Sequence, residues 1–225
     1  ISWTSPETIF TQGGNAVVST FLSSSTDWNN PNPDYTYPQQ AFSYQVSEDL
    51  LRCYSDGDLR RTAFFKNSLH AAIPDKYKTW MDYNDNDEIG MDFLIRLPEV
   101  ILNKAEALAM LTRDGDAKTE LEKLRSKRFA AAPSVTATGE ALIDFIRDER
   151  RRELCFEGHR WFDLRRQGMP EIKHTYKAEK GGAVYEYVLQ QGDPMYTIPF
   201  PNSVVLQNRA LVQNPSREMG ARQGE

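Results

Sequence analysis

Residues 147–166 constrain the fold of this chain more than any other stretch, because twenty positions hold seven arginines and five acidic residues. The segment reads as a helix, and residues four apart on a helix are neighbours. Arg147 and Arg151 therefore repel each other unless acidic groups from other elements lie between them. The pattern predicts several helices locked together by ion pairs.

The sequence offers both kinds of partner that arginines prefer. Glu99, Glu157 and Asp163 are candidate acids from outside the helix that carries the arginines. A guanidinium group pairs with a carboxylate through two parallel hydrogen bonds and also stacks on aromatic rings. Trp161 and Phe162 are the nearest such rings in the sequence.

Three interpretations of this segment compete. A nucleic-acid surface needs unneutralised basic residues, but the segment carries only +2 and the whole chain −5. A catalytic site needs a carboxyl group of raised pKa, whereas neighbouring arginines lower the pKa of a carboxyl. A structural ion-pair network meets neither objection. We expect the network, with a ligand-binding role as the less favoured alternative.

Apolar periodicity predicts a helical hairpin in the middle of the chain. Residues 94–111 form the clearest helix, with a core-facing stripe of Leu97, Ile101, Ala105, Leu108 and Leu111. A second helix follows over residues 116–129, and Gly115 is placed for a left-handed cap between them. Such a pair of helices is the unit of tetratricopeptide arrays.

The remaining elements are shorter. Further helices are expected from Ser47, over residues 139–156 and over residues 159–167, and a strand over residues 183–190. Residues 196–208 are expected to form a strand edge followed by a short proline-started helix. The fold class is therefore mainly α, a tetratricopeptide-like helical hairpin scaffold with long loops and a few short strands. We expect a single unit over residues 1–225, divided into a loop-rich region (1–92), a helical framework (93–168) and a closing segment (169–225).

The sequence "IRDERRRELCFEGHRWFDLRRQG" resembles the C-terminal signature of the SusD/RagB family. Nearly every fixed position of that signature is present between Ile146 and Arg166. Two more stretches are similar to the family in the expected order, "IRLPEVILNKAEALA" and "YTIPFPNSVVLQNRALVQNP". The resemblance is firm over residues 93–215 and loose before them.

The resemblance implies a function as well as a fold. Members are outer-membrane lipoproteins of Bacteroidetes that bind glycans, or in some cases peptides, for import through a SusC-like TonB-dependent transporter. They are not enzymes, and no cofactor is expected. The chain looks like the C-terminal portion of such a protein, so the lipid anchor and leader would lie outside it. No apolar run reaches the roughly 18–20 residues that cross a bilayer.

The family signature marks framework, so ligand-binding residues have to come from the loops. Sugar rings stack on exposed aromatic faces, and their hydroxyl groups need polar side chains at the edges. Two polar loops combine these features, "TDWNNPNPDYTY" and "KYKTWMDYNDND". The candidate glycan-binding residues are Trp28, Asn29, Tyr35, Tyr37, Trp80 and Tyr83. The alternative is that these aromatic residues pin long loops onto the helices.

No metal site is expected. Asp82, Asn84 and Asn86 alternate as at the start of a calcium-binding EF-hand, but Asp87 replaces the turn glycine and Phe93 the bidentate glutamate. A solvated acidic loop is the favoured interpretation, with adventitious calcium as the alternative. Cys53 and Cys155 lie in helical patterns and are expected to be free thiols, although a disulfide between them is a second possibility.

The expected function is thus non-catalytic oligosaccharide or polysaccharide binding at the cell surface. A peptide-binding or purely structural lid of the transporter is the first alternative. A glycoside hydrolase, which needs two carboxyl groups at a defined separation, is the second.

Overall fold

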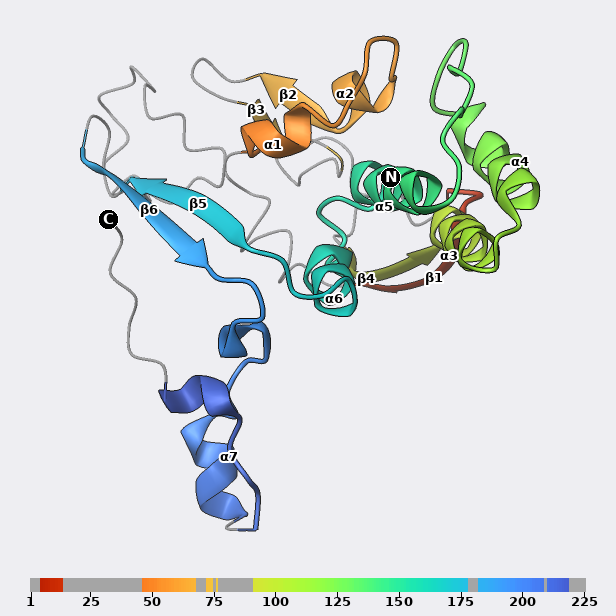
Figure 1. Cartoon of the computed structure of the whole chain (residues 1–225). Coiled ribbons are helices and arrows are strands. Elements are labelled where there is room, and N and C mark those ends of the chain that lie inside the picture. The colour runs from red at the N-terminus through yellow and green to blue at the C-terminus, as the bar shows by residue number, and fades with distance from the viewer. Residues whose placement is uncertain are drawn as a thin grey trace. The chain divides into compact units, whose positions relative to one another are not determined.

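The structure is a computed structural model, and it describes residues 5–13, 46–67, 72–74, 76, 91–177, 182–208 and 210–218 (Figure 1). The chain divides into two compact units, Ile1–Gly158 and His159–Glu225, and each is described by itself. The fold is mainly α, as predicted, and the described strands form three two-stranded antiparallel sheets. No helix in these described ranges is long and apolar enough to cross a membrane.

The first unit contains five helices and four strands in its described part. In chain order these are β1 (Thr8–Gly13), α1 (Glu48–Leu51), α2 (Arg60–Ala63), β2 (Phe65–Asn67), β3 (Ala72–Pro74), β4 (Met91–Arg96), α3 (Leu97–Met110), α4 (Asp114–Arg125) and α5 (Glu140–Glu153). Helices α3, α4 and α5 lie together in Figure 1 and share one apolar core. That core consists of Leu102, Ala105, Ala109, Ala117, Leu121, Leu124, Leu142, Ile146 and Leu154.

The predicted α3–α4 hairpin is confirmed, but the apolar stripe of α3 is rotated from the predicted face. Ala105 is buried as expected, whereas Leu97 and Leu111 are exposed. The buried positions are instead Leu102 and Ala109. Both faces of this helix carry apolar residues, so periodicity alone did not identify the one against which α4 and α5 pack.

The turn between α3 and α4 also differs from the prediction. Thr112, with φ of 59°, adopts the left-handed conformation that was expected of Gly115, and Gly115 lies inside α4. The Thr112 amide donates to the carbonyl of Ala109, and the Arg113 amide to that of Leu108. These bonds satisfy carbonyl groups at the end of α3, which is what a helix C-cap provides. The helix therefore ends earlier than the glycine suggested.

Residues 94–96 were predicted to begin a helix but belong to strand β4. This strand pairs antiparallel with β1, and Thr8 lies opposite Arg96. The long-range pairing supplies backbone hydrogen bonds that the start of a helix would leave unmade. The chain then turns directly into α3, with Pro98 in the first helical turn, where its missing N–H costs no hydrogen bond.

A smaller cluster forms around α1 and the β2–β3 hairpin. Ser47 caps α1 as predicted, because its hydroxyl accepts a hydrogen bond from the Leu50 amide at 3.2 Å. The buried members are Val46, Leu50, Tyr54, Phe64, Phe65 and Cys155. The hydroxyl of Tyr54 donates to the carbonyl oxygen of Arg152 at 2.7 Å, which ties this cluster to the end of α5.

The second unit begins with α6 (His159–Arg166) and continues through the hairpin of β5 (Ile172–Lys177) and β6 (Val184–Leu189) to short helical segments. These are η2 (Pro194–Tyr196), α7 (Asn202–Gln207) and η3 (Pro215–Glu218). The ring of Trp161 stacks on that of Tyr196, with centroids 4.9 Å apart. The predicted strand over β6 and the helix after Pro201 are confirmed, but residues 197–201 form no strand.

Candidate functional site

All six residues predicted to bind glycan, Trp28, Asn29, Tyr35, Tyr37, Trp80 and Tyr83, lie outside the described residues. The acidic loop at residues 82–87 does too. Their role as a site stays a prediction. The described part of the chain does show what the arginine-rich segment builds, and the most deeply buried members of the segment are two acids, Glu149 and Glu153.

Glu149 is the first of two buried acids on α5. Its side chain is inaccessible to solvent, and three arginines surround it. Arg60 Nη1 lies 2.7 Å from Oε1, Arg125 Nη1 lies 2.9 Å from Oε2, and Arg152 Nη2 lies 2.8 Å from Oε2. Two of these arginines come from α2 and α4. The acid therefore links three helices.

Glu153 lies one turn further along α5 and is equally buried. Its carboxylate accepts from Arg60 at 3.0 Å, from Arg96 at 2.7 Å and from Arg128 at 2.9 Å. Its main-chain carbonyl oxygen accepts from Lys76 and from a second nitrogen of Arg96, both at 2.6 Å. One residue of α5 thus joins four segments that are distant in sequence.

Glu157 and Glu7 extend this network at its edges. Glu157 accepts from Arg96 Nη2 at 2.6 Å and also pairs with Lys76. Glu7, just before β1, accepts from Arg128 Nη2 at 2.9 Å. We call these residues together the buried ion network; its members are Glu7, Asp58, Arg60, Lys76, Arg96, Arg125, Arg128, Glu149, Arg152, Glu153 and Glu157.

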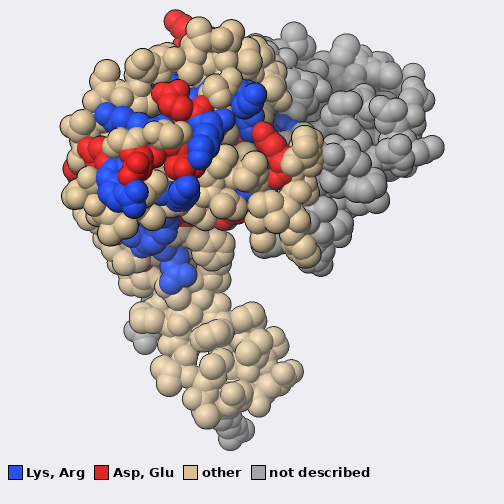
Figure 2. Space-filling model, turned by 90° about the vertical axis from the view of Figure 1, so that its right-hand side faces the viewer, with Lys and Arg blue, Asp and Glu red and all other residues tan. Residues whose placement is uncertain are grey.

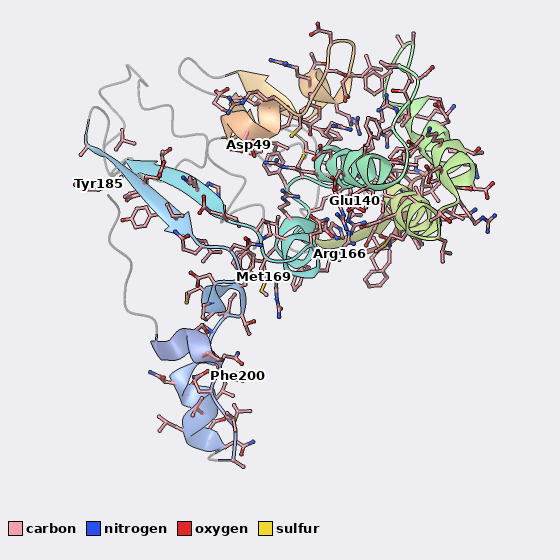
Figure 3. The ribbon with its side chains drawn as sticks, viewed as in Figure 1. Asp49, Glu140, Arg166, Met169, Tyr185 and Phe200 are labelled. Carbon is pink, nitrogen blue, oxygen red and sulfur yellow. The ribbon has the colours of Figure 1, made fainter. Side chains whose placement is uncertain are left out.

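The like charges at Arg147 and Arg151 are separated by acids from other elements, as the helical spacing required. Arg147 Nε lies 3.3 Å from Glu106 of α3, and Arg151 Nη2 lies 2.6 Å from Asp49 of α1. Asp49 is labelled on α1 in Figure 3. The prediction that such acids exist is confirmed. The acids themselves differ from those nominated, because tertiary packing decides which helices face α5.

The three nominated acids have other partners. Glu99 lies 3.7 Å from Arg150, and Glu157 pairs with Arg96 in the buried ion network. Asp163 pairs with Arg166 one turn along α6. Each of the three acids therefore pairs with an arginine, and Figure 2 shows that acidic and basic side chains are interspersed on the face of the molecule in that view.

The arginines also cover two aromatic rings that were not predicted. Arg125 lies over Phe129 and Phe145, 4.9 and 5.1 Å from the ring centroids, and Arg152 lies over Phe145. Trp161 instead stacks on Tyr196. Phe145 and Phe129 flank the network in space, which proximity in sequence did not reveal.

The environment of these acids favours their charged forms. Burial by itself would raise the pKa of Glu153, but hydrogen bonds from Arg128 and the charge of Arg96 outweigh burial and lower it to about 2. For Glu149, burial is likewise outweighed by Arg60 and Arg152, so its pKa is lowered. Carboxylates of lowered pKa cannot donate a proton near neutral pH. The network is therefore unsuited to general acid catalysis.

Sequence reasoning missed most of the basic members that come from outside the segment. The sequence analysis did not single out Arg60, Lys76, Arg125 or Arg128. One of these residues could have been found from the sequence. Asp58 lies two residues before Arg60 and pairs with it at 2.7 Å, so the nearby acid indicated that Arg60 forms an ion pair. Among the described residues, no group of histidine, cysteine and acidic side chains is arranged to hold a metal ion.

The model of the SusD family, SusD_RagB, matches residues 19–216. The chain belongs to the SusD family. The motif that carried the resemblance is thus, in this SusD-family chain, the segment that supplies Glu149, Glu153 and Glu157 to the buried ion network. No curated protein matches the chain.

Solved structures show the same fold. A SusD superfamily protein from Parabacteroides distasonis is 18% identical with a TM-score of 0.62, and the match covers 93% of this chain and 50% of that one. A SusD-like carbohydrate binding protein from Bacteroides vulgatus is 22% identical with a TM-score of 0.54, covering 75% and 41%. A protein from the same species, provisionally named a sugar binding protein, is 27% identical with a TM-score of 0.55, covering 74% and 37%. The SusD-family chain therefore spans half or less of each.

Proposed function

We propose that this chain forms part of a cell-surface protein that binds an oligosaccharide or polysaccharide without chemical conversion. The observation that carries the proposal is the match to the SusD family over residues 19–216. The names of two similar structures, a carbohydrate binding protein and a provisional sugar binding protein, support glycan as the ligand class.

The electrostatics of the described residues support binding rather than catalysis. A glycoside hydrolase needs one carboxyl group that is protonated near neutral pH and a second at a set distance from it. Glu149, Glu153 and Glu157 lie among arginines, and the pKa of each is lowered. Their role in this proposal is to hold the helices in place while loops contact the ligand.

The ligand loops proposed here contain Trp28 and Trp80, with Tyr83, Tyr35, Tyr37 and Asn29 around them. Indole and phenol rings supply flat apolar faces for the sugar, and asparagine supplies hydrogen bonds to its hydroxyl groups. No nucleic acid is expected to bind, because the chain carries a net charge of −5.

The proposal includes a partner and a location. The glycan would pass to a SusC-like TonB-dependent transporter in the outer membrane, with the protein held at the surface by a lipid anchor outside this chain. Co-purification of a TonB-dependent transporter with the tagged full-length protein from solubilised outer membranes is the expected result. Recovery of the protein from the membrane fraction without any such transporter would contradict this part.

The binding experiment uses native gels that contain soluble starch, xylan, galactan or yeast mannan. We expect one of these polysaccharides to retard the full-length protein, and the variants Trp28→Ala and Trp80→Ala to lose that retardation. Phe162→Ala is the matched control, because Phe162 is an exposed aromatic residue on α6, outside both loops. Unchanged retardation of both tryptophan variants would show that the glycan contact lies outside these two loops. Failure of every polysaccharide to retard the parent protein would favour a structural lid of the transporter.

A reducing-sugar assay with the retarding polysaccharide tests the alternative of hydrolysis. We expect no release of reducing ends above the blank. Steady release by the purified protein would replace the binding proposal with a glycoside hydrolase.

A further inference from the structure

The β5–β6 hairpin carries an aromatic face that lies outside the two tryptophan-containing loops. In its antiparallel register Tyr176 lies opposite Tyr185, and His174 lies opposite Tyr187. Directly opposed residues in an antiparallel pair point to the same side, and so do residues two apart on one strand. These four side chains therefore share one face of the ribbon, which we call the tyrosine face.

The three phenol rings of the tyrosine face are accessible. Tyr176, Tyr185 and Tyr187 are 44%, 42% and 37% exposed. Tyr176 and Tyr187 meet diagonally across the two strands, with ring centroids 6.5 Å apart and planes at 75°. Figure 3 labels Tyr185 near the turn end of the hairpin. The rings recur about every 6.7 Å along β6, the distance between alternate strand residues.

The opposite face of the ribbon differs in character. It presents Lys173, Thr175, Val184, Glu186 and Val188, and the first four of these are exposed. Lys173 and Glu186 lie on this face. They are the charged residues of β5 and β6 whose side chains the structure describes. The described part of the tyrosine face holds no lysine, arginine or acidic side chain. Because side chains alternate between the two faces of a strand, the tyrosine rings lie on one face of the hairpin and the charged side chains lie on the other.

An exposed, uncharged face of phenol rings suits a ligand with flat apolar surfaces and hydroxyl groups. Sugar rings have both, and the tyrosine hydroxyl groups and His174 can donate to and accept from sugar hydroxyls. A nucleic acid or an acidic ligand would require cations, and Lys173 lies on the other face. Each cross-strand pair stabilises a two-stranded ribbon by only a fraction of a kilocalorie per mole. Stability of the hairpin therefore explains the exposed tyrosines less well than a role in stacking against a ligand does.

We propose that the tyrosine face of the β5–β6 hairpin is a second carbohydrate-contact surface, separate in sequence from the tryptophan loops. This proposal rests on the proposed function in so far as the ligand class is a glycan. It assigns Tyr176 and Tyr187 as stacking residues and His174 as an edge contact.

The test uses the full-length protein and the polysaccharide that retards it in native gels. Tyr176→Ala and Tyr187→Ala are each expected to weaken affinity about three- to tenfold, the effect of losing one aromatic stacking contact. Tyr187→Phe should retain most of the affinity, since it keeps the ring. Thr175→Ala, on the opposite face, is the control and should bind as the parent protein does.

Loss of folding has to be separated from loss of binding. Circular dichroism and the thermal midpoint of each variant should match those of the parent protein, because both tyrosines are exposed. Parent-level affinity in both alanine variants would overturn the tyrosine face while leaving the proposed function intact. Equal loss of affinity in Thr175→Ala, or a collapsed circular dichroism spectrum in the tyrosine variants, would identify a structural hairpin and also overturn it. Failure of the parent protein to bind any of the four polysaccharides would overturn both proposals.

Discussion

Arg96 Nη1 lies 2.7 Å from Glu153 Oε1, and these side chains are only 2% and 0% exposed. Arg96 ends β4 and Glu153 ends α5, so the pair fastens a strand to a helix across 57 residues of sequence. A buried pair of this kind is strongly destabilising to break, because the remaining charge has no partner and no water.

The first prediction concerns this pair. Glu153→Gln should lower the free energy of unfolding by about 3–5 kcal/mol, since it leaves Arg96, Arg60 and Arg128 short of a negative charge. Urea unfolding followed by circular dichroism measures the change. Asp116→Asn is the matched control: its pair with Arg113 is exposed, so the change should stay below about 1 kcal/mol. Similar costs for the two substitutions would contradict a stabilising network.

The second prediction is a loss of stability in acid. The pKa of Glu153 falls from an ordinary 4.5 to about 2 on folding, so between these values the unfolded chain binds more protons than the folded one. The contribution is complete above pH 4.5 and is lost as the pH falls towards 2. Urea midpoints measured across this range should decline steeply, and more shallowly in Glu153→Gln. Equal slopes would show that this carboxylate is not responsible.

The third prediction concerns the turn between α3 and α4. Thr112 has a positive φ, which is unfavourable for a β-branched residue, so Thr112→Gly should raise the free energy of unfolding by about 0.5 kcal/mol. Thr119 lies within α4, where the same change should lower it by a few tenths. Opposite signs in urea unfolding are expected. If both substitutions lower the free energy of unfolding, the positive φ of Thr112 does not strain the turn enough for glycine to stabilise it.

The fourth prediction concerns the two cysteines, which are both free thiols. Cys53 is half-buried and Cys155 is buried, and burial raises the pKa of each thiol. A thiol reagent should label Cys53 slowly in the folded protein and both cysteines after denaturation. Mass spectrometry of the labelled peptides gives the assignment. A denatured, unreduced sample that takes up no label would reveal a disulfide.

The fifth prediction concerns the second unit. Tyr196 is buried, stacks on Trp161 and donates its hydroxyl hydrogen to the carbonyl oxygen of Pro170. Tyr196→Phe keeps the stacking but leaves that carbonyl without its donor, so the free energy of unfolding should fall by about 1–2 kcal/mol. Tyr185→Phe, at an exposed position, should change it by less than about 0.5 kcal/mol. Thermal unfolding monitored by tyrosine and tryptophan fluorescence compares the two.

Local patterns predicted the described helices well and their partners poorly. Ser47 and Pro201 mark helix starts that the structure confirms, because capping and proline effects act over a few residues. Strand β4 was missed because its hydrogen bonds come from β1, whose paired residues lie 78 to 88 positions earlier in the sequence. Leu97 and Leu111 were assigned to the core because apolar spacing does not say which face of a helix another element will cover.

The same limit applies to the site. The spacing of Arg147 and Arg151 showed that intervening acids were needed, but the identity of Glu106 and Asp49 depends on how α3 and α1 pack against α5. Trp28, Trp80 and the other loop residues stay predictions, since they lie outside the described residues. The tyrosine face needed the strand register, which the sequence did not supply.

The spread of the buried ion network along the chain also bears on how the protein folds. Its contacts join residues separated by 121 positions for Glu7 and Arg128, by 93 for Arg60 and Glu153, and by 61 for Arg96 and Glu157. Closing such long loops is entropically costly, so these contacts form after the local α3–α4 hairpin. We therefore expect the energy of these contacts to act mainly on the rate of unfolding, so that breaking one of them should speed unfolding more than it slows folding.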